Sequence, residues 1–250
     1  MSANFDPWRQ TIPISDEYGN VLEVSMAELS VRQVYVTASA INYGAQIGAS
    51  FMLLLVLLLL TKASKRRSYI FLVNGFCLLI NTIRCILLAC LLTSNWYNPY
   101  TQLSADYSHI TNANIAVSIS TVILTLLVTI LVFISLGLQV WVVCVTTNPL
   151  RRGIIMATTT IVGTVALGYR IALAVFNVQA VLAQTEMGPH QRLISDCYVV
   201  QAVAIWVYSC VFTYKLGNAI YQRRRLNMPQ FGPMQIVFIM GCQTMVIPGT

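Results

Sequence analysis

The sequence predicts an all-α protein, a multispanning bundle of transmembrane helices. The first observation is composition: 57% of the 250 residues are hydrophobic and only 9% are charged, whereas soluble domains carry about 25% charged residues. The second is that the apolar residues form long runs, and a helix needs about 20 of them to cross a bilayer. These runs do not alternate polar and apolar residues, as the strands of a membrane barrel would.

Six runs are long enough to be spans. They are residues 35–61, which close on "FMLLLVLLLL", 70–93, 114–145, 154–178, 198–220 and 234–250. The last has 17 residues, near the lower limit for a span. Residues 1–34 form an N-terminal segment without the apolar core of a cleavable signal peptide. The first span is therefore expected to direct membrane insertion.

The basic residues predict the orientation of the bundle. The connectors after the first, third and fifth spans, together with the last turns of the fifth span, contain no acid and ten basic residues: Lys62, Lys65, Arg66, Arg67, Arg151, Arg152, Lys215, Arg223, Arg224 and Arg225. The N-terminal segment and the other connectors hold Arg9, Arg32 and Arg192 with all the acidic residues. By the positive-inside rule, the N-terminus is expected to be extracellular. Six spans would then leave Thr250 outside, so a seventh span with a cytoplasmic tail is expected beyond it.

Several functions are excluded by what the chain lacks. No Asp or Glu lies within a predicted span, although proton-coupled transporters and cation pumps usually need such carboxylates. His109 and His190 fall in different connectors, too isolated to hold a metal. No nucleophile elbow, zinc-protease motif or phosphate loop occurs, so no enzyme activity or cofactor is predicted. The net charge of +7 is expected to attract anionic lipid and not nucleic acid.

Polar residues inside the second span share one helical face. Asn74, Asn81 and Arg84 follow at i, i+7 and i+10, and because lipid contact would be costly, this face is expected to point into the bundle. Arg84 lies in the outer half, as does Arg170 in the fourth span. Two interpretations stay open for these arginines: snorkelling to the outer headgroups, or lining an outward-open polar pocket that holds a ligand.

The remaining polar features suggest helix contacts. Gln139 in the third span lies at a height similar to Asn74, so a hydrogen bond between them is expected, worth ~0.6–2 kcal/mol in a membrane. Gly44 and Gly48 form a GxxxG stretch, which serves either internal packing or homodimerisation. In the sixth span Pro248 kinks or ends the helix, and Gln243 can satisfy a backbone group that the proline frees.

One stretch of the chain resembles the fifth-to-sixth helix region of fungal α-factor-type mating pheromone receptors, the class D G-protein-coupled receptors: "YKLGNAIYQRRRLNMPQFGPMQIVFIMGCQTMVIPG". The matching elements are Lys215, Arg223-Arg224, Gln230-Phe231 and the run from Ile239 to Pro248. Further similarities are "IFLVN" ending at Asn74, "SLGLQV" around Gln139, the Gly44/Gly48 pair, and "EYGN" followed by "MAEL". The likeness begins near residue 15.

The resemblance implies a seven-helix receptor in the plasma membrane that binds a secreted peptide pheromone and activates a heterotrimeric G protein. It also implies roles for particular residues. Asn74 and Gln139 would link the second and third helices, and Gln243 and Pro248 would form the activation element of the sixth. Lys215, Arg223 and Arg224 would face the G protein, while Gly44 and Gly48 would form a homodimer contact. The ligand would contact Gln46, Arg84, Ile194 and Ser195.

The sequence departs from the family pattern at two positions, and the seventh helix and cytoplasmic tail that the resemblance implies are expected beyond Thr250. Gln46 stands where the yeast-type receptor has an arginine between the glycines, and Arg84 replaces a different polar residue. Pheromone preference is expected to differ accordingly. Two alternatives also stay open: a six-helix transporter or channel subunit, and a truncated, non-signalling partner of the full receptor.

Overall fold

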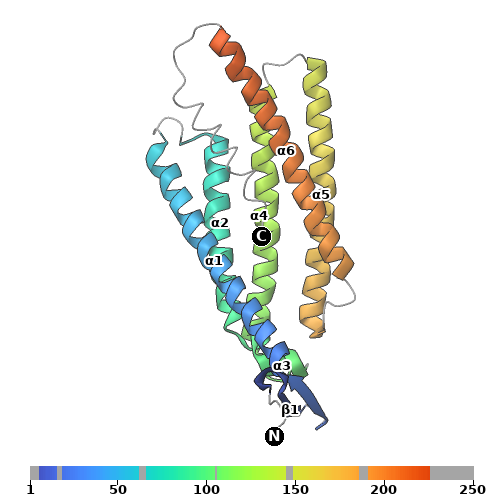
Figure 1. Cartoon of the computed structure of the whole chain (residues 1–250). Coiled ribbons are helices and arrows are strands. Elements are labelled where there is room, and N and C mark those ends of the chain that lie inside the picture. Colours follow the sequence, from blue (N-terminus) through green and yellow to red (C-terminus); the bar gives the residue numbers. More distant parts are fainter. Residues whose placement is uncertain are drawn as a thin grey trace. The chain divides into compact units, whose positions relative to one another are not determined.

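The computed structural model describes residues 6–15, 19–61, 66–104, 106–144, 149–185 and 191–225, and Figure 1 shows their elements in chain order. The predicted sixth span, 234–250, lies outside these residues. Five described helices are long and apolar enough to cross a membrane, which supports an all-α bundle in a multi-pass membrane protein. They are α1 (Met26–Leu60), α2 (Tyr69–Leu92), α4 (Asn112–Cys144), α5 (Pro149–Ala183) and α6 (Gln191–Arg225).

A β-hairpin precedes α1 and was not among the sequence predictions. Strand β1 (Thr11–Ser15) pairs antiparallel with β2 (Val21–Ser25), in a register that places Thr11 opposite Ser25. A short 3-10 helix, η1 (Pro7–Arg9), leads into β1. The connection contains Gly19 at φ +81°, a left-handed conformation that glycine adopts without strain. The alternation in "TIPIS" and "VLEVS" is the signal that could have predicted these strands.

Helix α1 follows the hairpin directly. The Ser25 hydroxyl accepts a hydrogen bond from the backbone N–H of Glu28 at 3.2 Å, and the "SMAE" order is that of a capping box. The backbone N–H of Met26 also donates to the carbonyl of Gln10 at 3.0 Å. These bonds explain why α1 begins at Met26, nine residues before the predicted membrane boundary at 35.

Two other helices also extend past the predicted apolar runs. Helix α5 begins at Pro149, since proline suits a first helical turn, where its missing N–H costs no bond. Helix α6 begins at Gln191 and continues to Arg225. Apolar runs mark the membrane-buried part of a helix, so they do not reveal polar turns outside it. The short elements η3 (Asn95–Tyr97) and α3 (Pro99–Ser104) lie between α2 and α4.

The chain divides into two compact units. The first contains residues 1–61, 78–125 and 178–185, so it includes the hairpin, α1, the second part of α2, η3 and α3. The second contains residues 62–77, 126–177 and 186–250, with most of α4, α5 and α6.

The second unit has its own apolar core. Helices α4, α5 and α6 supply Phe133, Val140, Cys144, Ala166, Ala204, Tyr208 and Phe212. A methyl group added at Gly163 of α5 would lie 2.7 Å from the Tyr208 hydroxyl oxygen, so the absence of a side chain lets Tyr208 of α6 approach α5. Many large apolar side chains on the helices are exposed, among them Leu59, Phe76 and Ile161. In a membrane protein such side chains face lipid.

Candidate functional site

Polar and aromatic side chains gather on one face of α1 in the first unit. At about 100° per residue, six of the seven polar or aromatic residues from Tyr35 to Ser50 fall within roughly 60° of Gln46 around the helix, and the seventh, Thr37, lies on the opposite side. The six are Tyr35, Ser39, Asn42, Tyr43, Gln46 and Ser50. Apart from Tyr35, which is exposed, these side chains are half-buried or buried. A polar face of this length inside an apolar helix indicates a built interior site.

Helix α2 supplies the partners of this face. Asn81 donates from Nδ2 to the Ser50 hydroxyl at 2.8 Å, which satisfies a buried group. One turn further along, Arg84 donates from Nη2 to Oε1 of Gln46 at 3.2 Å. Gln46 in turn donates from Nε2 to Oδ1 of Asn42 at 3.0 Å. The structure therefore brings together two of the four predicted ligand residues, Gln46 and Arg84.

The Cys85 thiol completes this group, which we call the Arg84 cluster (Asn42, Gln46, Arg84 and Cys85). It is fully buried and donates to Oε1 of Gln46 at 3.3 Å. Arg84 points sideways toward α1 about 12 Å before the end of α2 at Leu92, using ~1.5 Å per residue. The hydrogen bond to Gln46 thus directs Arg84 toward a neighbouring helix and not toward headgroups beyond the end of α2. Arg170, the other arginine with two interpretations, is half-buried on α5.

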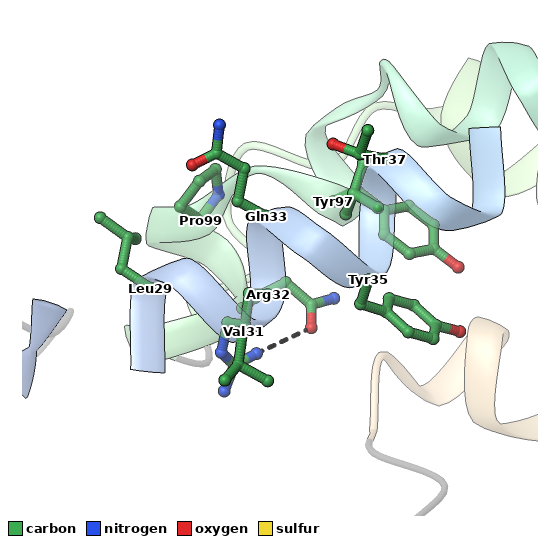
Figure 2. Close-up of a pocket in the computed structure, with 10 residues that line it drawn as sticks. Leu29, Val31, Arg32, Gln33, Tyr35, Thr37, Tyr97 and Pro99 are labelled. Carbon is green, nitrogen blue, oxygen red and sulfur yellow. Dashed lines mark hydrogen bonds between the residues drawn. The ribbon is translucent and has the colours of Figure 1, made fainter. Parts of the chain in front are cut away.

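A pocket of about 510 Å³ lies at the N-terminal end of the same helix. Its walls come from the first turns of α1 and from Tyr97, Pro99 and Gln102 (Figure 2). The dashed line in Figure 2 is a hydrogen bond from Nη1 of Arg32 to Oε1 of Gln102, 3.1 Å long. The volume is typical of ligand pockets. Sequence reasoning did not find this pocket, because its two walls are about 65 residues apart in the chain.

Tyrosines gather at one end of this pocket. Figure 2 shows the rings of Tyr35 and Tyr97 at the same end. The pKa of Tyr97 is raised to about 12, mainly because the phenol is buried and to a smaller extent because the hydroxyls of Tyr35 and Tyr43 lie nearby. The Tyr97 phenol therefore stays neutral at physiological pH, when it can both donate and accept a hydrogen bond.

A second polar contact joins α2 and α4 within the second unit. The buried Ser135 hydroxyl donates to Oδ1 of Asn74 and accepts from Nε2 of Gln139, the latter at 3.1 Å. The sequence suggested a direct bond between Asn74 and Gln139, whereas the structure links them through Ser135. Gln201 of α6 also donates to the Thr129 hydroxyl of α4, at 3.5 Å.

The remaining predicted residues lie elsewhere. Ile194 is half-buried and Ser195 exposed in the first two turns of α6, in the second unit, and Lys215 is half-buried further along the same helix. The α6 backbone continues through Arg223 and Arg224, whose side chains are outside the described part. Gln243 and Pro248 lie outside the described residues altogether.

Gly44 and Gly48 are exposed on α1. They lie roughly 160° around the helix from Gln46, on the side opposite the polar face. A methyl group placed at either glycine would meet nothing within 4 Å. Within the described residues this pair therefore takes no part in close internal packing.

Comparison with known proteins identifies the family. The family model of the fungal pheromone mating factor STE2 G-protein-coupled receptors matches residues 5–250. The chain is 24% identical over 251 residues to the pheromone P-factor receptor of Schizosaccharomyces pombe, covering 96% of this chain and 70% of that receptor. It is 24% identical to the pheromone alpha factor receptor of Saccharomyces cerevisiae, covering 98% of this chain and 56% of that receptor.

A third relative gives a similar result. The pheromone alpha factor receptor of Lachancea kluyveri is 25% identical over 254 residues, covering 99% of this chain and 58% of that receptor. The chain thus spans between about half and 70% of the length of these relatives. Because the family match extends over nearly the whole sequence, the chain belongs to the fungal pheromone mating factor STE2 family of G-protein-coupled receptors.

Proposed function

We propose that this protein is a plasma-membrane receptor for a secreted peptide mating pheromone and signals through a heterotrimeric G protein. The family match supports the receptor class. The single structural observation that carries the proposal is the polar face of α1 with its α2 partners, which offers hydrogen-bonding groups inside an apolar bundle. A peptide needs such groups, because its own buried amides must be satisfied.

The ligand-binding residues of this proposal are Gln46, Arg84, Ile194 and Ser195. The hydrogen bond between Gln46 and Arg84 supports the first two as one site. The half-buried Ile194 and exposed Ser195, near the beginning of α6, are open enough to meet a ligand.

The proposed orientation places the N-terminus outside the cell. The hairpin and the pocket at the N-terminal end of α1 would then be extracellular, and the basic connectors cytoplasmic. In this arrangement Lys215, Arg223 and Arg224, on the final turns of α6, would face the G protein.

Signalling requires that the ligand bind one receptor conformation more tightly than another. The bonds from Ser135 to Asn74 and Gln139 would stabilise one conformation of α2 against α4. Such bonds in membranes are weak enough, at ~0.6–2 kcal/mol, to break during a transition. Gln243 and Pro248 would complete the activation element in the predicted sixth span, residues 234–250, which follows α6.

We also propose a homodimer through Gly44 and Gly48. Their exposure and the open space beside them leave this face of α1 free for close approach by a second helix.

The function is tested in yeast cells that lack their own pheromone receptor and carry a G-protein-dependent growth reporter. The full chain is co-expressed with a library of secreted random peptides. A subset of peptides is expected to restore growth, and the double variant R223A/R224A should reduce growth while peptide binding at the cell surface persists. If no peptide binds cells with verified surface expression, the receptor proposal is wrong, whereas peptide binding without growth would favour the non-signalling partner.

A further inference from the structure

The positive charge of Arg84 has no counterion in the described chain. A guanidinium remains protonated in proteins, and the ion pairs found among the described residues, Arg9–Asp6 and Arg32–Glu28, do not include it. Its hydrogen bonds run from Nη2 to two neutral acceptors, Oε1 of Gln46 at 3.2 Å and Sγ of Cys85 at 3.7 Å. These bonds orient the guanidinium without neutralising it.

The other two guanidinium nitrogens have no acceptor among the described residues, and of the two only Nη1 is not buried. Nε is buried and has no acceptor among the described residues. Nη1 likewise has no described acceptor, and it is not among the buried unpaired atoms. An unneutralised charge held partly out of water is costly unless another group compensates it, and charged residues within spans typically mark functional sites.

A carboxylate is the ligand group that fits this site best. Its two oxygens match the paired donors of a guanidinium, and such charge-assisted bonds are about twice as strong as neutral ones. The sideways direction of Arg84, toward Gln46 on α1, points to a ligand within the helices and not to a lipid headgroup beyond the end of α2.

We propose that Arg84 binds a carboxylate of the pheromone peptide and that Gln46 positions the guanidinium for this contact. The carboxylate belongs either to the peptide's C-terminus or to an Asp or Glu side chain. This inference rests on the proposed receptor function. Tyr35, in the pocket near Tyr97, is 11 residues before Gln46 on the same face of α1. That distance, about 16 Å, equals roughly five extended residues, which is the length of peptide that the proposal requires between the two places.

Three synthetic peptide libraries test the proposal by affinity selection on the full chain in lipid nanodiscs. The first has free C-terminal carboxylates and lacks Asp and Glu. The second has C-terminal amides and also lacks Asp and Glu, so it carries no carboxylate. The third has C-terminal amides but includes Asp and Glu. Peptides from the first or third library are expected to be enriched ten-fold or more over those of the second, as expected for a hydrogen bond to a charged group, worth ~1.5–3 kcal/mol.

Variants assign the preference to Arg84. R84Q should abolish it, and R84K, which keeps the charge but loses the paired donors, should retain part of it. R192Q, at an exposed arginine in the first turn of α6, should leave it unchanged. Thermal unfolding of each variant shows that it is folded.

The outcomes separate this inference from the function on which it rests. Equal enrichment of the carboxylate-free library on the wild-type chain would overturn the role of Arg84 and leave the receptor proposal standing, as would an unchanged preference in folded R84Q. Enrichment of no peptide over empty nanodiscs would overturn both. Enrichment of the first or the third library identifies the source of the carboxylate.

Discussion

Neutral polar side chains form several of the hydrogen bonds between α1, α2 and α4. Ser50 with Asn81, and Ser135 with Asn74 and Gln139, are small hydrogen-bonded groups at which neighbouring helices meet. Within a bilayer each polar group lacks water as an alternative partner, so its loss leaves the remaining group unsatisfied. The serine in each group is buried.

Ser135→Ala is expected to raise ligand-independent signalling. The substitution removes the hydroxyl that both Asn74 and Gln139 contact, and a loss of ~0.6–2 kcal/mol corresponds to roughly a three- to thirty-fold shift between conformations. Basal reporter activity at matched surface expression measures the change. Ser120→Ala, at an exposed serine of the same helix, is the control. Unchanged basal activity in S135A would argue that this contact is the same in both conformations.

The residues of the site were only partly predictable. Arg84 and Asn74 stand out in the sequence because charged and amide side chains are rare in spans. Ser135 does not, since hydroxyls can bond to the preceding turn of their own helix and are common in spans. The partnership of Ser50 with Asn81 depends on how α1 is rotated against α2, which no periodicity within one helix determines.

At the scale of elements, the packing of α5 against α6 depends on a glycine. Gly163→Ala is expected to destabilise the fold by about 1–3 kcal/mol, as overpacking typically does, because the new methyl would lie 2.7 Å from the hydroxyl oxygen of buried Tyr208. Thermal unfolding in nanodiscs measures the loss.

Two further variants serve as controls for Gly163→Ala. Gly168→Ala on the same helix meets nothing within 4 Å and should be neutral or slightly stabilising, since alanine favours helix by about 1 kcal/mol. Adding Tyr208→Phe to Gly163→Ala removes the clashing oxygen and leaves ring carbons at 3.5 Å, so stability should recover. A failure to recover would place the strain elsewhere.

The connection between α2 and α4 should lose order in acid. Hydrogen bonds from Ser108, with a smaller contribution from the Tyr100 hydroxyl, lower the pKa of Asp106 below its usual 3.8. A carboxyl with a lowered pKa in the folded state stabilises it above the unfolded pKa, and this stabilisation is lost as the pH falls through the folded value. Hydrogen exchange of residues 95–111 should therefore accelerate below about pH 3.8. In Asp106→Asn this pH dependence should disappear.

Helix existence was predictable, whereas helix ends and short elements were less so. The length of an apolar run reports the membrane thickness, and it correctly located α1, α2, α4, α5 and α6. The start of α1 instead depends on the Ser25 cap, and that of α5 on Pro149. Both signals are local and lie in polar sequence outside the apolar run.

At the scale of the whole molecule, self-association is expected to depend on the exposed glycines of α1. Gly44→Leu with Gly48→Leu should weaken dimerisation about ten-fold or more, because close approach of two helices at this face requires small residues. Förster resonance energy transfer between fluorescently labelled copies of the chain in membranes measures the extent of dimerisation. Ala45→Leu, at an exposed residue between the glycines, is the control, and thermal stability should be unchanged throughout. Equal energy transfer in all variants would rule out this dimer face.

The hairpin and α1 share a residue: Ser25 ends β2 and caps the helix, and the N–H of Met26 is bonded to Gln10. No linker separates the sheet from the first span. An antibody fragment bound to β1 and β2 would therefore rotate together with α1. Such a fragment could serve as a fiducial marker in electron microscopy. The angle between such a fiducial and the bilayer plane would give a direct record of how that helix leans before and after agonist is added.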